Sequence, residues 1–232
     1  METPFTPTPQ DVERYRKLRA LTADLNEQIM KAIPRRALDE VGEALGMRRD
    51  GILVFDSMDM MSVLVDCCLY DWFQNGKNVV QRYAEAHPPK PGTDEGYLLQ
   101  ACLQAKYRML VVQSAVAGAG LYCQDVLNNE GLFLMDVALS QSAESGKAAL
   151  ATRTLPLGEY WMTSGAGLPI NSKKTALDAL AQIAGGKPQL LKGPGSVALL
   201  IVRTCLAAGA ADHVSYANLA AKPEKSHRRP RS

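Results

Sequence analysis

Apolar and polar positions follow two patterns along the chain: a helical pattern toward both ends, and a strand pattern over residues 107–170. In this central stretch, short apolar runs rich in β-branched and aromatic residues recur about every 10–14 residues. Glycine and asparagine separate the runs, and both tolerate the positive φ angles of tight turns. The pattern predicts strands over residues 107–116, 121–127, 132–137, 148–155 and 160–164.

The predicted strands are short, and a sheet of a few short strands needs another layer to pack against. The run at 148–155 is alanine-rich and has helical propensity, but Gly146 before it and Pro156 after it favour a strand. We therefore expect an α+β fold, with a small antiparallel β-sheet or half-barrel packed against helices. The pattern leaves open whether the sheet closes into a barrel.

Apolar residues at three- and four-residue spacing predict helices on both sides of the sheet. The expected helices cover residues 8–32, 34–45, 58–73, 77–86, 93–105, 172–185 and 196–208. The helix at 58–73 is apolar over most of its circumference, which predicts a place in the middle of the protein. Residues 52–55 are too few to decide between a strand and the start of a helix, and 165–169 are expected to form a loop.

The predicted elements group into four regions. These are a helical region at 1–106, the small antiparallel sheet or barrel at 107–170, C-terminal helices at 171–221, and a disordered basic tail at 222–232. Residues 88–92 form a proline-rich linker within the first region. Residues 1–7 are rich in proline and threonine, and we expect them to be loose.

Composition narrows the cellular setting. The chain is 47% hydrophobic and 22% charged, as is usual for a globular protein. It has no uninterrupted apolar run of about 18 residues that would span a membrane, and its start does not resemble a signal peptide. The five cysteines are odd in number and lack paired spacing, which indicates reduced thiols. We predict a cytoplasmic protein without membrane contact.

Basic residues are concentrated at the C-terminus. Residues 222–232 hold five of the 26 basic residues and one of the 24 acidic residues, so the remainder carries a net charge of −2. The five are Lys222, Lys225, Arg228, Arg229 and Arg231. They are candidate contacts to nucleic-acid phosphates, but no aromatic residue lies among them to stack on bases. A solubilising, disordered end is the favoured interpretation.

Four aspartates lie in or near the apolar helix at 58–73, namely Asp56, Asp59, Asp66 and Asp71. Paired carboxylates can hold a divalent ion or act in acid–base catalysis. No histidine or glutamate recurs at ligand spacing beside them, so we interpret Asp56 as a helix cap and the others as solvated or salt-bridged. The cysteines contain no C-x-x-C, and none of the G-x-G pairs continues into a nucleotide-binding pattern. The sequence predicts no catalytic residue, no metal site and no cofactor.

A ligand site between the sheet and the helices would draw on polar residues of the predicted strands. The candidates are Cys123, Asp125, Arg153 and Tyr160. Cys123 has the chemistry of a nucleophile if a distant histidine activates it, although core filling is the favoured role for a cysteine. Tyr160 and Trp161 alternate on a strand, so one of the two should face outward.

Residues 121–168 resemble a domain found in uncharacterised bacterial proteins, some of which also carry a cysteine-rich SEC-C zinc motif. The resemblance rests on residues 124–127, 146–157 and 162–165. This chain lacks a terminal motif rich in C-x-C, so the zinc association does not carry over. The resemblance implies no activity.

The leading hypothesis is a non-enzymatic protein-interaction module that binds a protein partner or itself, as a homo-oligomer. The sheet face and the last helix, with its many apolar residues, are the candidate surfaces. One alternative is a nucleic-acid-associated protein that uses the small barrel and the basic tail. The other is a small-ligand-binding protein or enzyme with a site between sheet and helices.

Overall fold

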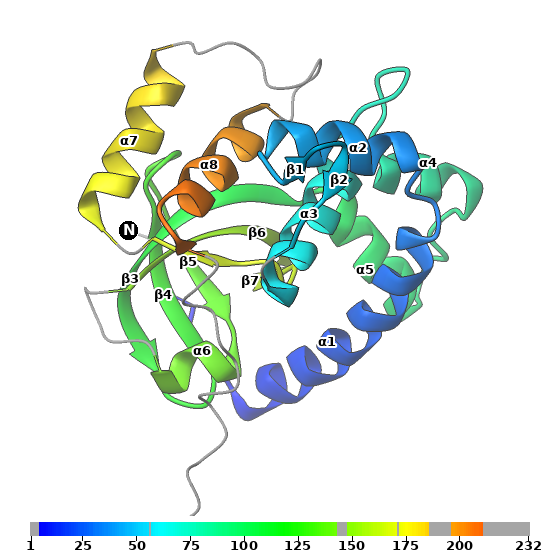
Figure 1. Cartoon of the computed structure of the whole chain (residues 1–232). Helices are drawn as coiled ribbons and strands as arrows, with labels where there is room; N and C mark the ends of the chain where they lie inside the picture. Colours follow the sequence, from blue (N-terminus) through cyan, green and yellow to red (C-terminus); the bar gives the residue numbers. More distant parts are fainter. Residues whose placement is uncertain (1–4, 56, 143–147, 171, 186–195, 211–232) are drawn as a thin grey trace, which may run out of the picture.

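The computed structural model describes residues 5–55, 57–142, 148–170, 172–185 and 196–210 (Figure 1). The predicted α+β class is confirmed. The helices are α1 (Pro9–Met30), α2 (Arg35–Ala44), α3 (Met58–Tyr70), α4 (Val79–Ala86), α5 (Asp94–Leu103), α6 (Val137–Ser142), α7 (Lys173–Ala184) and α8 (Ser196–Ala207). The strands are β1 (Arg48–Arg49), β2 (Ile52–Leu53), β3 (Lys106–Val116), β4 (Gly120–Asp125), β5 (Glu130–Met135), β6 (Ala149–Leu157), β7 (Tyr160–Thr163) and β8 (Leu168–Pro169).

Strand β3 closes the central sheet into a barrel because it pairs with two strands. Its first half pairs with β6, from Lys106 opposite Thr154 onward, and its second half pairs with β4. A bulge between Val112 and Ser114 bends the strand where it passes from one partner to the other. The ring then runs through β4, β5, β7 and β6 back to β3, which settles the question of closure that the sequence pattern left open.

The pairings identify the type of barrel. All pairs in the ring are antiparallel except β5 with β7, which run parallel at Leu134 and Trp161. Helix α6 lies between β5 and β6 in the chain, so the third and fourth strands of the barrel are joined through a helix. A five-stranded Greek-key barrel with its strands in the order first, second, third, fifth, fourth has the connectivity of the OB-fold.

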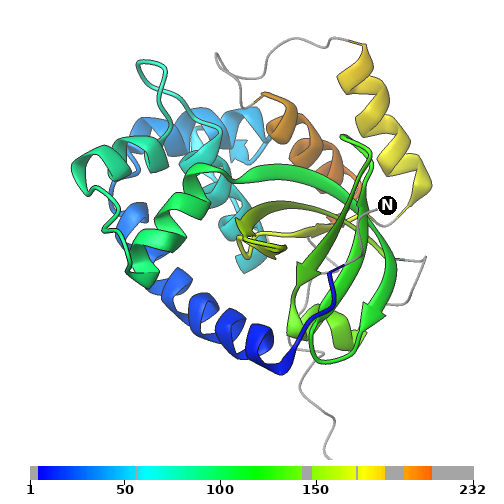
Figure 2. The same ribbon diagram turned by 180° about the vertical axis from the view of Figure 1, so that it is seen from behind.

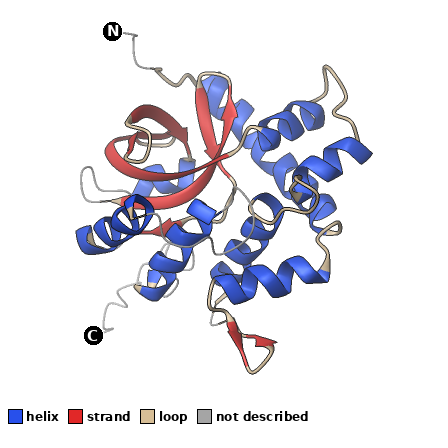
Figure 3. Ribbon diagram, turned by 90° about the horizontal axis from the view of Figure 1, so that it is seen from above, coloured by secondary structure: helices blue, strands red, loops and turns tan. Residues whose placement is uncertain are grey.

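Alternation along the strands gives the barrel two apolar faces. One face packs into a small cluster inside the barrel, to which Leu110, Leu121 and Leu134 belong. The other face packs outward into the main core with the helices, and includes Met109 and Met162. Figure 3 shows the barrel strands on one side of the molecule and most of the helices on the other.

Helix α3 occupies the middle of the helical layer, as its apolar circumference predicts. Its side chains from Val63 to Tyr70 are largely buried, and the helix contacts α1, α2, α4 and α8. It ends at Tyr70, before the predicted Phe73, with Asp71 as its C-cap. Helix α1 begins with the predicted cap: Thr8 Oγ1 accepts from the Asp11 amide and the Asp11 carboxylate accepts from the Thr8 amide.

Two short elements differ from the sequence-based expectation, at residues 137–142 and 168–169, and a third, at 52–53, was left open by it. Residues 137–142 form α6, where the strand prediction extended to Val137; Asp136 ends the strand by accepting the Leu139 amide at 3.0 Å. Ile52 and Leu53 form a strand of a two-stranded hairpin with β1. Leu168 and Pro169, expected in a loop, pair with β6.

None of the helices in the described ranges is both long and apolar enough to cross a membrane.

Candidate functional site

The four residues predicted to form a ligand site lie on opposite faces of the barrel wall. Cys123 belongs to the cluster inside the barrel, and Asp125, two residues further along β4, shares its face. Arg153 and Tyr160 lie on the outer face, toward the helices. The structure therefore does not bring the four together in one place.

Asp125 is bound by a buried arginine that the sequence reasoning missed. Arg108 Nη1 donates to Asp125 Oδ2 at 2.6 Å and to Glu130 Oε2 at 2.8 Å, and its guanidinium lies 4.4 Å from the centre of the Trp161 ring. Asp125 also accepts from the Leu127 amide at 3.0 Å. These bonds occupy the carboxylate and hold the turn after β4. Arg108 and Leu110 are two residues apart on β3, so their side chains lie on the same face of the strand. This spacing is the sequence signal that could have placed Arg108 inside the barrel.

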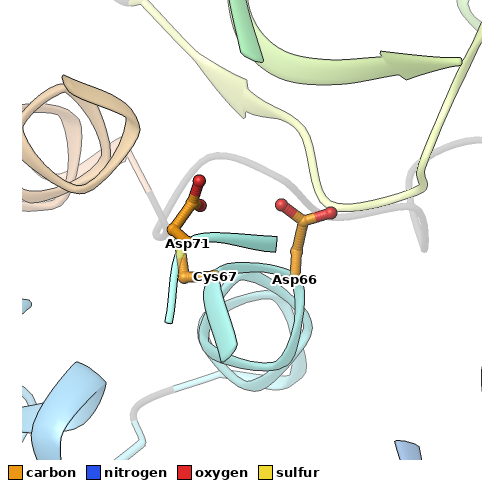
Figure 4. Close-up of side chains that lie close together, drawn as sticks. All are labelled: Asp66, Cys67 and Asp71. Carbon is orange, nitrogen blue, oxygen red and sulfur yellow. The ribbon is translucent and has the colours of Figure 1, made fainter. Parts of the chain in front are cut away.

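Arg153 is the centre of a second buried cluster, between β6 and α3. Its Nε donates to Asp66 Oδ2 at 2.9 Å and its Nη2 donates to Asp71 Oδ2. The guanidinium also lies 4.3 Å from the centre of the Tyr70 ring and 5.3 Å from that of Tyr107. Figure 4 shows both carboxyl groups pointing away from helix α3 on the same side. Asp66 and Asp71 are thus buried ion-pair partners rather than solvated edges.

Burial raises the pKa of Asp71 to about 7, and the neighbouring Asp66 charge acts in the same direction, while Arg153 opposes both. Oxygens of the two aspartates and the Cys67 sulfur lie within 4.8 Å of one another, close enough for a metal ion. The Arg153 guanidinium already binds both carboxylates, so we assign this cluster to the connection between barrel and helices. Asp59 is only half-buried, and Asp56 lies outside the described residues.

All five cysteines are unpaired and buried. Burial raises the pKa of Cys123 to about 12 and that of Cys102 and Cys205 to about 11. The thiolate is the nucleophilic form of cysteine, so at neutral pH these thiols are unreactive. Core filling, the favoured interpretation for Cys123, agrees with its position inside the barrel.

A groove of about 830 Å³ opens on the barrel wall formed by β4 and β5. Tyr122 and Phe133 are register partners on the outer face of these strands, and Gln124 is opposite Gly131 on the same face. Of the described residues, a Cβ atom at Gly131 would meet only Gln124, whose Oε1 lies 3.9 Å away, so they leave this part of the groove uncovered. The lining residues are Phe5, Gln113, Tyr122, Cys123, Gln124, Gly131, Leu132, Phe133, Glu159 and Trp161.

The chain's own N-terminal segment lies in one end of this groove. The Tyr122 hydroxyl donates to the Phe5 carbonyl oxygen at 2.6 Å. The Phe5 ring packs on Phe133 and Tyr160, with ring centroids 5.3 Å and 5.6 Å away. Figure 2 shows this segment running from the start of α1 along the barrel strands. The expectation that residues 1–7 are loose is therefore wrong at Phe5.

The groove is almost uncharged. Among the described residues that line it, Glu159, in the turn between β6 and β7, is the single acidic residue, and none is a lysine or arginine. Amide side chains and aromatic rings make up most of the rest. Of the two alternating aromatics on β7, Trp161 reaches the groove and Tyr160 is buried toward the helices beside Phe5. The predicted tail contacts, Lys222 to Arg231, lie outside the described residues.

Comparisons with known proteins identify the family but no activity. A family model described as a family of unknown function (DUF7986) matches residues 9–179, which is 171 of the 232 residues. The match includes the stretch whose resemblance to an uncharacterised domain is visible in the sequence. No curated protein and no solved structure matches the chain.

Proposed function

Because the chain belongs to the DUF7986 family, whose function is unknown, we propose a function from the geometry of the barrel. The protein is a non-enzymatic interaction module that binds an extended segment of a protein partner in the groove beside Tyr122 and Phe133. The observation that carries this proposal is the docking of Phe5 in the same groove. A second copy of the chain is one such partner, since it carries the same segment.

The place of the groove supports the proposal. In OB barrels, the face of the second and third strands and the loop between the fourth and fifth strands form the ligand surface. Here these are β4, β5 and the turn that holds Glu159, and all three line the groove. This is an argument from fold, so it supports the location of a site and leaves the ligand to be argued from the residues.

The contacts of Phe5 support a peptide as the ligand. The Tyr122 hydroxyl binds a main-chain carbonyl, which every peptide presents, and the Phe133 and Tyr160 rings select an aromatic side chain. A main-chain hydrogen bond together with a side-chain pocket is the usual way in which proteins bind extended peptides. The volume of the groove lies within the range of about 300–1,000 Å³ that is common for binding sites.

The charge of the groove argues against nucleic-acid binding, and the positions of the candidate residues argue against an enzyme site. Single-stranded nucleic acid is bound through a positively charged groove that follows the phosphates. The only ionic side chain among the described residues that line this groove is the negative Glu159. The small-ligand or enzyme alternative draws on Cys123, Asp125, Arg153 or Tyr160, and of these Cys123 alone is among the described lining residues of this groove. We also propose a cytoplasmic location, supported by five unpaired cysteines.

The test uses the full chain with Phe5→Ala, which removes the docked ring, and a synthetic peptide of residues 1–10 as the probe. We expect isothermal titration to show saturable binding of the peptide, and a peptide with Phe5→Ala to bind at least tenfold more weakly. Adding Tyr122→Phe to the Phe5→Ala protein removes the hydroxyl that binds the peptide carbonyl, and it should weaken binding of the unchanged peptide. A folded Phe5→Ala chain that does not bind the peptide at millimolar concentration would refute the proposal.

A further inference from the structure

Of the described residues that precede helix α1, Phe5 is the one that lines the groove. Phe5 contributes one ring and one carbonyl group, whereas Thr6 and Thr8 are exposed. Helix α1 is fixed independently, because Thr8 and Asp11 form a complete capping box on their own. Phe5 can therefore leave the groove without a change in the helix.

Phe5, the first described residue of this segment, lies at one end of the groove, against Phe133 and Tyr160. The described residues leave the part beside Gln124 and Gly131 uncovered. A longer extended peptide can reach contacts that the chain's own segment does not make. Such a peptide gains binding energy beyond that of Phe5, which is the condition for displacing it.

We infer, on the basis of the proposed function, that the segment around Phe5 is a built-in competitor that a partner must displace. The partner presents an aromatic side chain on an extended segment, with a main-chain carbonyl for the Tyr122 hydroxyl. Phe5 is followed two residues later by Pro7, and the residue before a proline is restricted to extended conformations. A proline at the same spacing after the aromatic residue fits the same path.

The size of the competition follows from effective concentration. A segment tethered by a short linker is present at its own site at roughly millimolar concentration. If the peptide of residues 1–10 binds an empty groove with a dissociation constant of about 0.1 mM, the tethered copy weakens its binding about tenfold. Opposite Glu159, a basic residue in the partner would add a contact that this peptide lacks.

The experiment compares one labelled peptide, residues 1–10, on three full-length proteins by fluorescence anisotropy: wild type, Phe5→Ala and Phe5→Leu. We expect Phe5→Ala to bind the peptide about tenfold more tightly than wild type, and Phe5→Leu to lie between them because it keeps an apolar side chain. Met30→Ala, which shortens an exposed side chain at the far end of α1, is the matched control and should bind as wild type does. Circular dichroism confirms that each variant is folded.

The outcomes separate this inference from the function on which it rests. Equal binding by wild type and Phe5→Ala would overturn the inference and leave the groove as a peptide site. Absence of binding to every folded variant would overturn both. Phe5→Leu keeps the test decisive if Phe5→Ala fails to fold, since its intermediate affinity is expected only from competition.

Discussion

Replacing Arg153 by methionine tests how the barrel is connected to its helices. The change keeps a long apolar side chain between Tyr70 and Tyr107 but removes the positive charge that binds Asp66 and Asp71. Both aspartates are 5% exposed, so neither can recover its solvation without a rearrangement. Removing one partner of a buried ion pair usually costs about 3–5 kcal/mol.

The structure bounds this cost and gives it a pH dependence. An unpaired buried carboxylate can lose its charge by taking up a proton. This protonation costs about 1.4 kcal/mol for each pH unit above the pKa of the group in the unfolded chain. For a buried aspartate with the reference pKa near 3.9, this limit is about 4 kcal/mol at pH 7 and about 1.5 kcal/mol at pH 5. Asp71 adds little at pH 7, because its pKa is already raised to about 7 in the wild type.

Urea unfolding followed by circular dichroism at pH 7 and pH 5 measures both values. We expect Arg153→Met to lose about 4 kcal/mol at pH 7 and clearly less at pH 5. The variant that combines Arg153→Met with Asp66→Asn and Asp71→Asn should recover most of the loss. Lys174→Met breaks an exposed ion pair with Asp178 and should change stability by less than about 0.5 kcal/mol. A loss below about 1 kcal/mol at pH 7, or an equal loss at both pH values, would refute the reasoning.

Two further predictions concern other buried groups. Because the pKa of Asp71 is raised from 3.8 to about 7 in the folded chain, its stabilising contribution is complete below about pH 3.8 and is lost as the pH rises through about 7. Asp71→Asn should remove this decline, and the comparison of unfolding free energies at pH 5, 6, 7 and 8 will show whether it does. The cysteines, with Cys68 and Cys123 at a pKa of about 12, should not react with a thiol reagent such as DTNB at pH 8 in the folded protein. All five should react after urea is added, and fast labelling of the native chain would contradict their burial.

Sequence periodicity located the helices and strands more successfully than it predicted which strands pair with each other. Glycine turns and alternating residues were enough to place β3 to β7, because those signals are local. Alternation along β4 also places the neighbouring residues Tyr122 and Cys123 on opposite faces of the sheet. Applied to each strand, it could have predicted which candidate residues face the barrel interior. Closure of the ring depends on the register of β3 against β6, and no local pattern carries that register. Helix α6, with six residues, is too short to show a helical period.

The candidate site depended on contacts that are distant in sequence. Arg153 bonds to Asp66 across 87 positions and Tyr122 to Phe5 across 117 positions. The proline- and threonine-rich start of the chain has no apolar period, so its composition predicts a loose segment. Phe5 is ordered by the aromatic surface that it meets, and this surface exists only after the barrel has formed.

The closed ring of strands has a consequence for synthesis of the chain. The contacts that close the ring join residues far apart in sequence. Thr154, in β6, pairs with Lys106 in β3, and its hydroxyl donates to the Lys106 carbonyl, 48 positions earlier in the chain. Until β6 and β7 leave the ribosome, the hairpins of β3, β4 and β5 have unpaired backbone on both outer strands, because β3 pairs with β6 and β5 pairs with β7. Such edges pair readily with other chains. We expect aggregation during translation to be greatest for nascent chains that end between β5 and β7, and to fall once residue 163 is exposed.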